Sequence, residues 1–96
     1  MIEVTVSTGR LSVAGHSDYG AKGKDIVCAG VSAITYTLVR SLDSLCADNV
    51  RISEGDGIAI LEYENLSERA KLLIDSFFIG ISGLVEAYPE HVRLRL

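Results

Sequence analysis

The chain has no tryptophan, one proline, and only two cysteines and two histidines among its 96 residues. These few sulfur and imidazole ligands are scattered without the paired spacing of a zinc site, so we expect no metal and no cofactor. Basic residues are also scarce: nine Lys and Arg stand against thirteen Asp and Glu, for a net charge of −4. Because surfaces that follow nucleic acid phosphates are rich in Lys and Arg, we expect no nucleic-acid partner.

Long hydrophobic runs are absent as well. The apolar stretches fall short of the roughly 18 residues needed to cross a bilayer, and the first residues include no basic segment typical of a signal peptide. We therefore expect a cytoplasmic protein without a membrane partner. A length of 96 residues with 48% hydrophobic and 23% charged residues is typical of a single globular domain, residues 1–96.

What is present is a regular spacing of apolar side chains, with one period typical of strands and another typical of helices. Residues 2–7 and 11–14 alternate apolar with polar side chains as strands do, and so do residues 49–54, 58–63 and 92–96. Residues 26–45 and about 67–87 repeat apolar side chains every three or four positions, which predicts two helices. The fold class is therefore α+β, a two-layer sandwich in ββαββαβ order. We expect a mixed or antiparallel sheet of about five strands, with both helices on one face.

The first helix begins at a cysteine. Asp25 is a good N-cap residue, which places Cys28 in the first helical turn. The positive end of the helix dipole favours a thiolate over a thiol, and the thiolate is the nucleophilic form. Backbone N–H groups of Cys28 and Ala29 would then be candidates to stabilise an oxyanion.

A histidine lies twelve residues before that cysteine, at the end of the second predicted strand. His16 could act as base and then as acid beside Cys28, which is the minimum arrangement for thiol catalysis. The segment between them contains no large aliphatic residue, so we expect a mobile loop that closes over a substrate. This predicted substrate loop comprises Ser17, Asp18, Tyr19, Gly20, Ala21, Lys22, Gly23 and Lys24.

The same residues resemble a known family, the ribosomal-processing cysteine proteases (Prp). Its members have a Gly-His dipeptide, a mobile loop and a Lys-Asp-(aliphatic)₂-Cys-Ala segment that opens a helix. Here these are Gly15-His16 and residues 24–29, KDIVCA, with Ser32 one turn further on. The resemblance extends more weakly over the whole chain, in length, in element order and in a Tyr-Pro-Glu segment, residues 88–90, before the last strand.

The resemblance implies a function and a set of residue roles. Family members remove a short N-terminal extension from large-subunit ribosomal protein twenty-seven and work as homodimers of two-layer α/β subunits. Carried over to this sequence, Cys28 would be the nucleophile and His16 its acid/base partner. Gly15, Asp25 and Ser32 would match positions that support this pair.

The same residues allow other interpretations. Cys28 could be a small buried residue, and His16 a surface histidine. Cys46 is interpreted as a packing residue at the end of the first helix, and His91 as solvated. Asp18 stands where a phosphate-binding loop would need glycine, and Asp25 where it would need Ser or Thr, which excludes that motif.

The sequence thus predicts a cysteine endopeptidase whose partner is the N-terminal segment of a large-subunit ribosomal protein. The alternative is a non-catalytic peptide-binding module associated with ribosome assembly. A thiol redox sensor is a third hypothesis, against which stands the lack of a neighbouring resolving cysteine.

Overall fold

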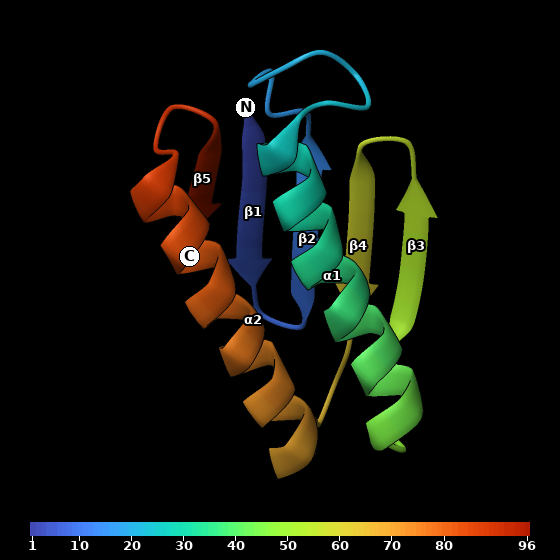
Figure 1. Ribbon diagram of the computed structural model, residues 1–96. Coiled ribbons are helices and arrows are strands. Elements are labelled where there is room, and N and C mark those ends of the chain that lie inside the picture. Colours follow the sequence, from blue (N-terminus) through green and yellow to red (C-terminus); the bar gives the residue numbers. More distant parts are fainter.

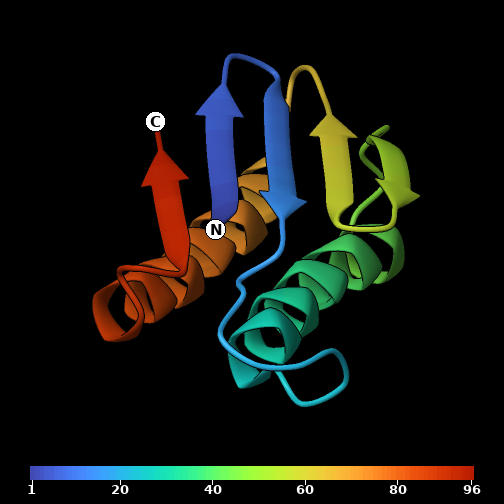
Figure 2. The same ribbon diagram turned by 90° about the horizontal axis from the view of Figure 1, so that it is seen from above.

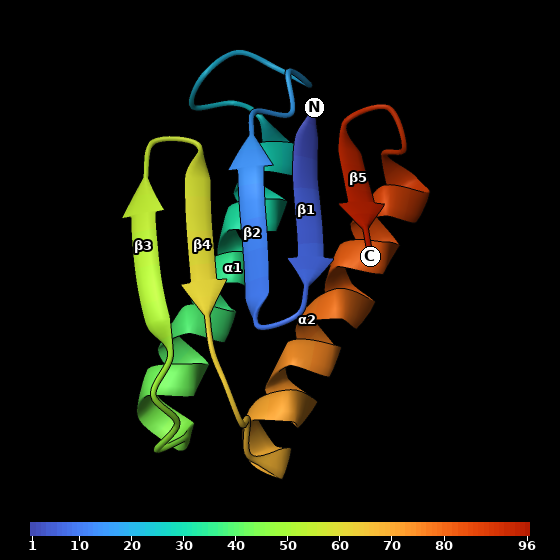
Figure 3. The ribbon, with the colours of Figure 1, turned by 180° about the vertical axis from the view of Figure 1, so that it is seen from behind.

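The computed structural model describes residues 1–96, and its seven elements follow the predicted order. The strands are β1 (Ile2–Ser7), β2 (Arg10–Gly15), β3 (Arg51–Gly55), β4 (Ile58–Glu62) and β5 (Val92–Arg95); the helices are α1 (Ile26–Leu45) and α2 (Glu68–Ala87). Both helices lie on one face of the sheet, and the other face is uncovered (Figures 2 and 3). The predicted two-layer α+β fold is therefore confirmed.

The five strands form one mixed sheet in the order β3-β4-β2-β1-β5. The hairpins β1–β2 and β3–β4 and the β2–β4 contact between them are antiparallel, whereas β5 runs parallel to β1 at the far edge. A parallel neighbour requires a crossover, and α2 supplies it. That crossover brings residues 88–91, between α2 and β5, to the end of the molecule where β1 begins (Figure 1).

The core lies between the sheet and the two helices. Fourteen apolar residues form it, contributed by all strands except β3 and by one stripe of each helix. From α1 the stripe comprises Val27, Val31, Leu38 and Leu42, and from α2 it comprises Ala70, Ile74, Phe77 and Ile81. Leu45, the last residue of α1, is 53% exposed.

By length and composition alone, α1 is apolar enough to cross a membrane, contrary to the expectation from the apolar runs. One such helix is weak evidence, because the core helix of a globular domain passes the same test. The buried stripe of α1 packs against the sheet, as in a core helix. Cys46, its C-cap residue, packs against this core as expected, and both cysteines are free thiols.

Candidate active site

Four segments meet at one end of the molecule, the upper end in Figure 1. They are the end of β2, the loop of residues 16–25, the start of α1 and the β3–β4 turn. Between them lies a cleft of about 740 Å³. His16 and Cys28 both line this cleft, so the structure brings the two predicted residues to one cavity.

Cys28 is half-buried in the first turn of α1, where the sequence placed it. Asp25 is the N-cap residue, and its Oδ1 accepts hydrogen bonds from the N–H groups of Val27 at 3.0 Å and Cys28 at 2.9 Å. The cap thereby fixes where the helix starts and how the backbone of Cys28 is oriented.

The expected oxyanion role of two backbone amides is not met in this structure. The N–H of Cys28 is bonded to the Asp25 carboxylate at 2.9 Å, and the N–H of Ala29 donates to the Asp25 carbonyl oxygen at 3.0 Å. Both donors therefore already have acceptors, and neither is free to hold a developing negative charge.

The second carboxylate oxygen of Asp25 forms hydrogen bonds with the loop. Oδ2 accepts hydrogen bonds from the hydroxyl of Ser17, from the N–H of Tyr19 at 3.1 Å and from the N–H of Gly20 at 3.2 Å. The Cys28 N–H, the Ser17 hydroxyl and the two loop amides together hold the pKa of the Asp25 carboxyl at about 2. The side chain is ionised at neutral pH and ties the loop to the helix start.

His16 is exposed at the mouth of the cleft, just after the end of β2. Its ring lies against the backbone of Gly57 in the β3–β4 turn, so closely that a Cβ on Gly57 would come within 2.7 Å of Nε2. No hydrogen bond joins His16 to Cys28 in the free chain, a state common in enzymes before substrate binds.

Gly15 makes the turn into His16 sterically feasible. Its φ of +105° is one that L side chains rarely adopt, and a Cβ there would lie only 2.3 Å from the carbonyl oxygen of Met1. Its N–H donates to the Gly57 carbonyl at 2.8 Å. Glycine is required at this position by both backbone conformation and space.

The predicted supporting and loop residues divide into two groups. Those that line the cleft are Gly15, Asp18, Gly20, Lys22, Gly23, Asp25, Ala29 and Ser32. Those that do not are Ser17, Tyr19, Ala21 and Lys24. Ser32 is exposed on the first half of α1, and its side chain lines the cleft one turn beyond Cys28.

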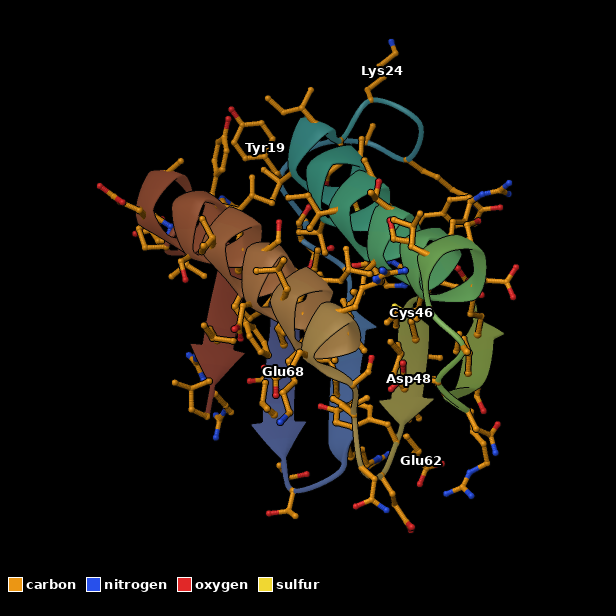
Figure 4. The ribbon with its side chains drawn as sticks, turned by 90° about the horizontal axis from the view of Figure 1, so that it is seen from below. Tyr19, Lys24, Cys46, Asp48, Glu62 and Glu68 are labelled. Atoms are coloured by element: carbon orange, nitrogen blue, oxygen red, sulfur yellow. The ribbon has the colours of Figure 1, made fainter.

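The expectation of a wholly unanchored loop is wrong for its first half. Ser17 is only 1% exposed, and Tyr19 makes edge contacts with the rings of Tyr88 at 5.3 Å and His91 at 5.2 Å. Figure 4 shows Tyr19 between the start of α1 and the end of α2, while Lys24 points away from the molecule. The loop thus has an anchored limb, residues 17–20, and an exposed limb, residues 21–24.

The expectation that His91 is solvated is also wrong. It is half-buried, and its Nδ1 lies 2.8 Å from the carbonyl oxygen of Ser17. Sequence reasoning also missed the cleft wall formed by the β3–β4 hairpin, residues 54–59, because the predicted strands 49–54 and 58–63 carry no local signal that their connection faces His16 and Cys28. No group of three or more His, Cys, Asp or Glu side chains is positioned to hold a metal ion.

Comparison with known proteins agrees with this geometry. The family model described as "Cysteine protease Prp" matches residues 1–93. The ribosomal processing cysteine protease Prp of Staphylococcus aureus is 30% identical over 83 residues, which cover 83% of this chain and 78% of that protein.

Two solved structures of the S. aureus protease also align with this chain. The one with a covalently linked product peptide aligns with a TM-score of 0.89 at 27% identity, over 98% of this chain and 95% of the other. The one with a substrate peptide gives 0.82 at 26%, with the same coverage. The chain therefore belongs to the ribosomal processing cysteine protease Prp family of cysteine-type peptidases.

Proposed function

We propose that this protein is an endopeptidase that removes the N-terminal extension of large-subunit ribosomal protein twenty-seven, with Cys28 as nucleophile and His16 as general acid and base. The observation that carries the proposal is that both side chains line one cleft, the cysteine at a helix start. S. aureus Prp has been crystallised with a substrate peptide and with a covalently linked product peptide, which supports a peptide occupant here.

The reaction follows from the chemistry of the two side chains. The Cys28 thiolate attacks the scissile carbonyl carbon, so that a C–S bond forms and the carbonyl electrons move to oxygen. The C–N bond then breaks, and His16 donates a proton to the departing amine. Water, deprotonated by His16, attacks the thioester and releases the new carboxylate together with the cysteine sulfur.

The exposed limb of the loop is proposed to close over the bound peptide. Residues 21–24 are exposed, and no core contact restrains them. Closure there would exclude water from the thioester while the anchored limb keeps His16 in place. We further propose that the reaction takes place in the cytoplasm, because its proposed substrate is a ribosomal protein.

We also propose that the protein acts as a homodimer, as the family resemblance implies. Leu72 and Ile79 of α2 are 69% and 76% exposed and lie seven residues apart, so they share one face of the helix. Large apolar side chains grouped on a surface favour a protein contact, and a second copy of this chain is the occupant proposed here.

Cleavage of the extended ribosomal protein by purified protein tests the assignment. Cys28→Ala should remove detectable cleavage while the thermal midpoint stays near that of the wild type, because Cys28 is only half-buried and alanine fits a helix. Cys46→Ala, at the other free thiol, is the matched control and should still cleave. Mass spectrometry of the substrate reads both results, and full cleavage by Cys28→Ala would refute the mechanism.

A peptide-binding module remains the second candidate, because the same cleft would hold a peptide without cutting it. Alkylation of Cys28 near neutral pH separates the two. A fast reaction that slows in His16→Ala supports the peptidase, whereas an inert thiol supports the module.

A further inference from the structure

The second histidine of the chain makes a long-range contact that no assigned role explains. His91, between α2 and β5, has its Nδ1 2.8 Å from the carbonyl oxygen of Ser17, a residue 74 positions away in sequence. A carbonyl oxygen can only accept, so Nδ1 carries the proton and donates it. Ser17 directly follows His16, so this bond holds the backbone one residue beyond the proposed acid and base.

Ser17 is held from its other side as well. Its side chain is 1% exposed, and its hydroxyl donates to Oδ2 of Asp25. The other oxygen of that carboxylate accepts the N–H of Cys28 at 2.9 Å. Separate hydrogen bonds to the carbonyl oxygen and the hydroxyl of Ser17 therefore connect His91, by way of Ser17 and the Asp25 carboxylate, to the backbone of Cys28.

Aromatic rings also pack between the loop and the segment that contains His91. The ring of Tyr19 meets the edges of Tyr88 and His91 with centroid distances of 5.3 and 5.2 Å and nearly perpendicular planes. Such edge contacts are favourable for aromatic rings and fix their relative orientation. His91 thus contacts the anchored limb in two ways, through its Nδ1–H and through its ring.

We infer that His91 is a positioning residue, which holds the backbone of His16 at a fixed place relative to Cys28 by clamping Ser17. His91 does not line the cleft, and its side chain contacts Ser17 and Tyr19 of the anchored limb, so it acts through Ser17. This inference rests on the proposed function, because a positioning role for His91 assumes that His16 assists Cys28.

Two substitutions separate the hydrogen bond from the bulk of the ring. His91→Phe keeps an aromatic ring against Tyr19 but has no donor, whereas His91→Asn places an amide N–H near the position of Nδ1. Glu90→Gln, at the exposed neighbouring residue, is the matched control. The readouts are the alkylation rate of Cys28 and kcat and KM for the extended ribosomal peptide.

The expected result is that His91→Phe lowers kcat by roughly 10- to 100-fold, the usual effect of a small misplacement, with KM within about twofold. It should also slow alkylation towards the rate of His16→Ala, while His91→Asn restores most of both values and Glu90→Gln changes neither. If His91→Phe does not fold, His91→Leu against His91→Asn gives the same comparison.

Wild-type alkylation and kcat in the donor-free variant would overturn the inference, and so would equal losses in His91→Phe and His91→Asn, which would indicate a general structural role. A wild-type chain that cleaves no peptide would instead refute the proposed function. In that case the alkylation comparison still decides whether His91 positions His16 against Cys28.

Discussion

At the scale of single residues, the site depends on glycine as much as on its reactive side chains. Gly57 has a φ of +69° and lies directly against the His16 ring. A side chain here would be strained by the left-handed backbone and would also push the imidazole away from the turn. The turn therefore sets how far the histidine ring can move towards the β3–β4 wall.

Gly57→Ala should accordingly lower kcat/KM by roughly 10- to 100-fold through displacement of His16. Gly23→Ala separates strain from contact, because Gly23 has a φ of +85° but nothing within 4 Å of the added Cβ. Because Gly23 lies on the limb proposed to close over the peptide, the two variants are compared by the alkylation rate of Cys28 without peptide, which Gly57→Ala should slow more than Gly23→Ala. Circular dichroism checks that both variants fold, and equal losses in the alkylation rate would contradict the steric explanation.

Asp25 gives the site a pH dependence whose sign follows from its low pKa. The carboxyl titrates at about 2 in the folded chain and at its ordinary value of 3.8 when unfolded, so its stabilising effect is complete above about pH 4. That effect is lost as the pH falls from about 4 to 2. Over pH 5 to 8 this group adds no slope to the stability.

Thermal melting of wild type and Asp25→Asn across pH checks this. The midpoint of the variant should lie below that of the wild type at pH 7, and the two curves should converge between about pH 4 and 2. Glu90→Gln, which alters an exposed carboxylate near the same end, should track the wild type. A gap between wild type and Asp25→Asn that persists unchanged at pH 2 would contradict the ionised cap.

At the scale of elements, α1 and α2 approach each other through small residues. A Cβ on Gly80 of α2 would meet Cδ1 of Ile34 at 3.2 Å, and one on Gly30 of α1 would meet Leu84 at 3.6 Å. Gly30 and Gly80 thus lie at the contact between the two helices, and closer packing there offsets the intrinsic cost of glycine in a helix.

Gly83, also in α2, has no neighbouring atom within 4 Å of the position that an added Cβ would take. Gly83→Ala should therefore raise the free energy of unfolding by about 0.5–1 kcal/mol, the helix propensity difference. Gly80→Ala receives the same propensity gain but must displace Ile34, so it should stabilise less or destabilise. Urea unfolding of the two variants measures the difference, and a larger gain for Gly80→Ala would contradict close helix packing.

At the scale of the whole molecule, local sequence patterns predicted the fold well because each helix and strand has its own signal in the residues that form it. Asp25 caps α1, Gly55-Asp56-Gly57 turns the second hairpin, and the two periodicities separate helices from strands. His16 and Cys28 were found for the same reason, since a strand end and a helix start are local features. The parallel pairing of β5 with β1 has no local signal in the sequence, because it depends on the crossover through α2.

Most parts of the site that sequence reasoning missed are long-range. The bond from His91 to Ser17 and the rings around Tyr19 join residues separated by most of the chain, and periodicity and capping rules contain no information about such pairs. The oxyanion expectation is different, because it overlooked a local consequence of the cap. In the free chain the Asp25 carboxylate accepts the Cys28 N–H and the Asp25 carbonyl oxygen accepts the Ala29 N–H.

The proposed dimer gives a prediction at this scale. Changing Leu72 and Ile79 together to Glu should shift the protein from dimer to monomer, because charges on an apolar contact must be desolvated. Asp43→Lys, at an exposed position of α1 and so away from the proposed α2 contact, should leave the dimer intact. Analytical ultracentrifugation reads the mass, and a wild-type monomer at high micromolar concentration would refute the dimer.

The separation of His91 from Cys28 along the chain also bears on synthesis, because His91 lies 63 positions after Cys28. A ribosome adds roughly 5–20 residues per second, so the histidine that clamps Ser17 is polymerised seconds after Cys28 has been made. During that interval the growing chain has its thiol and its first imidazole but not the contact that fixes their spacing. A nascent copy would thus lack that fixed spacing until the segment that contains His91 has been made and has packed.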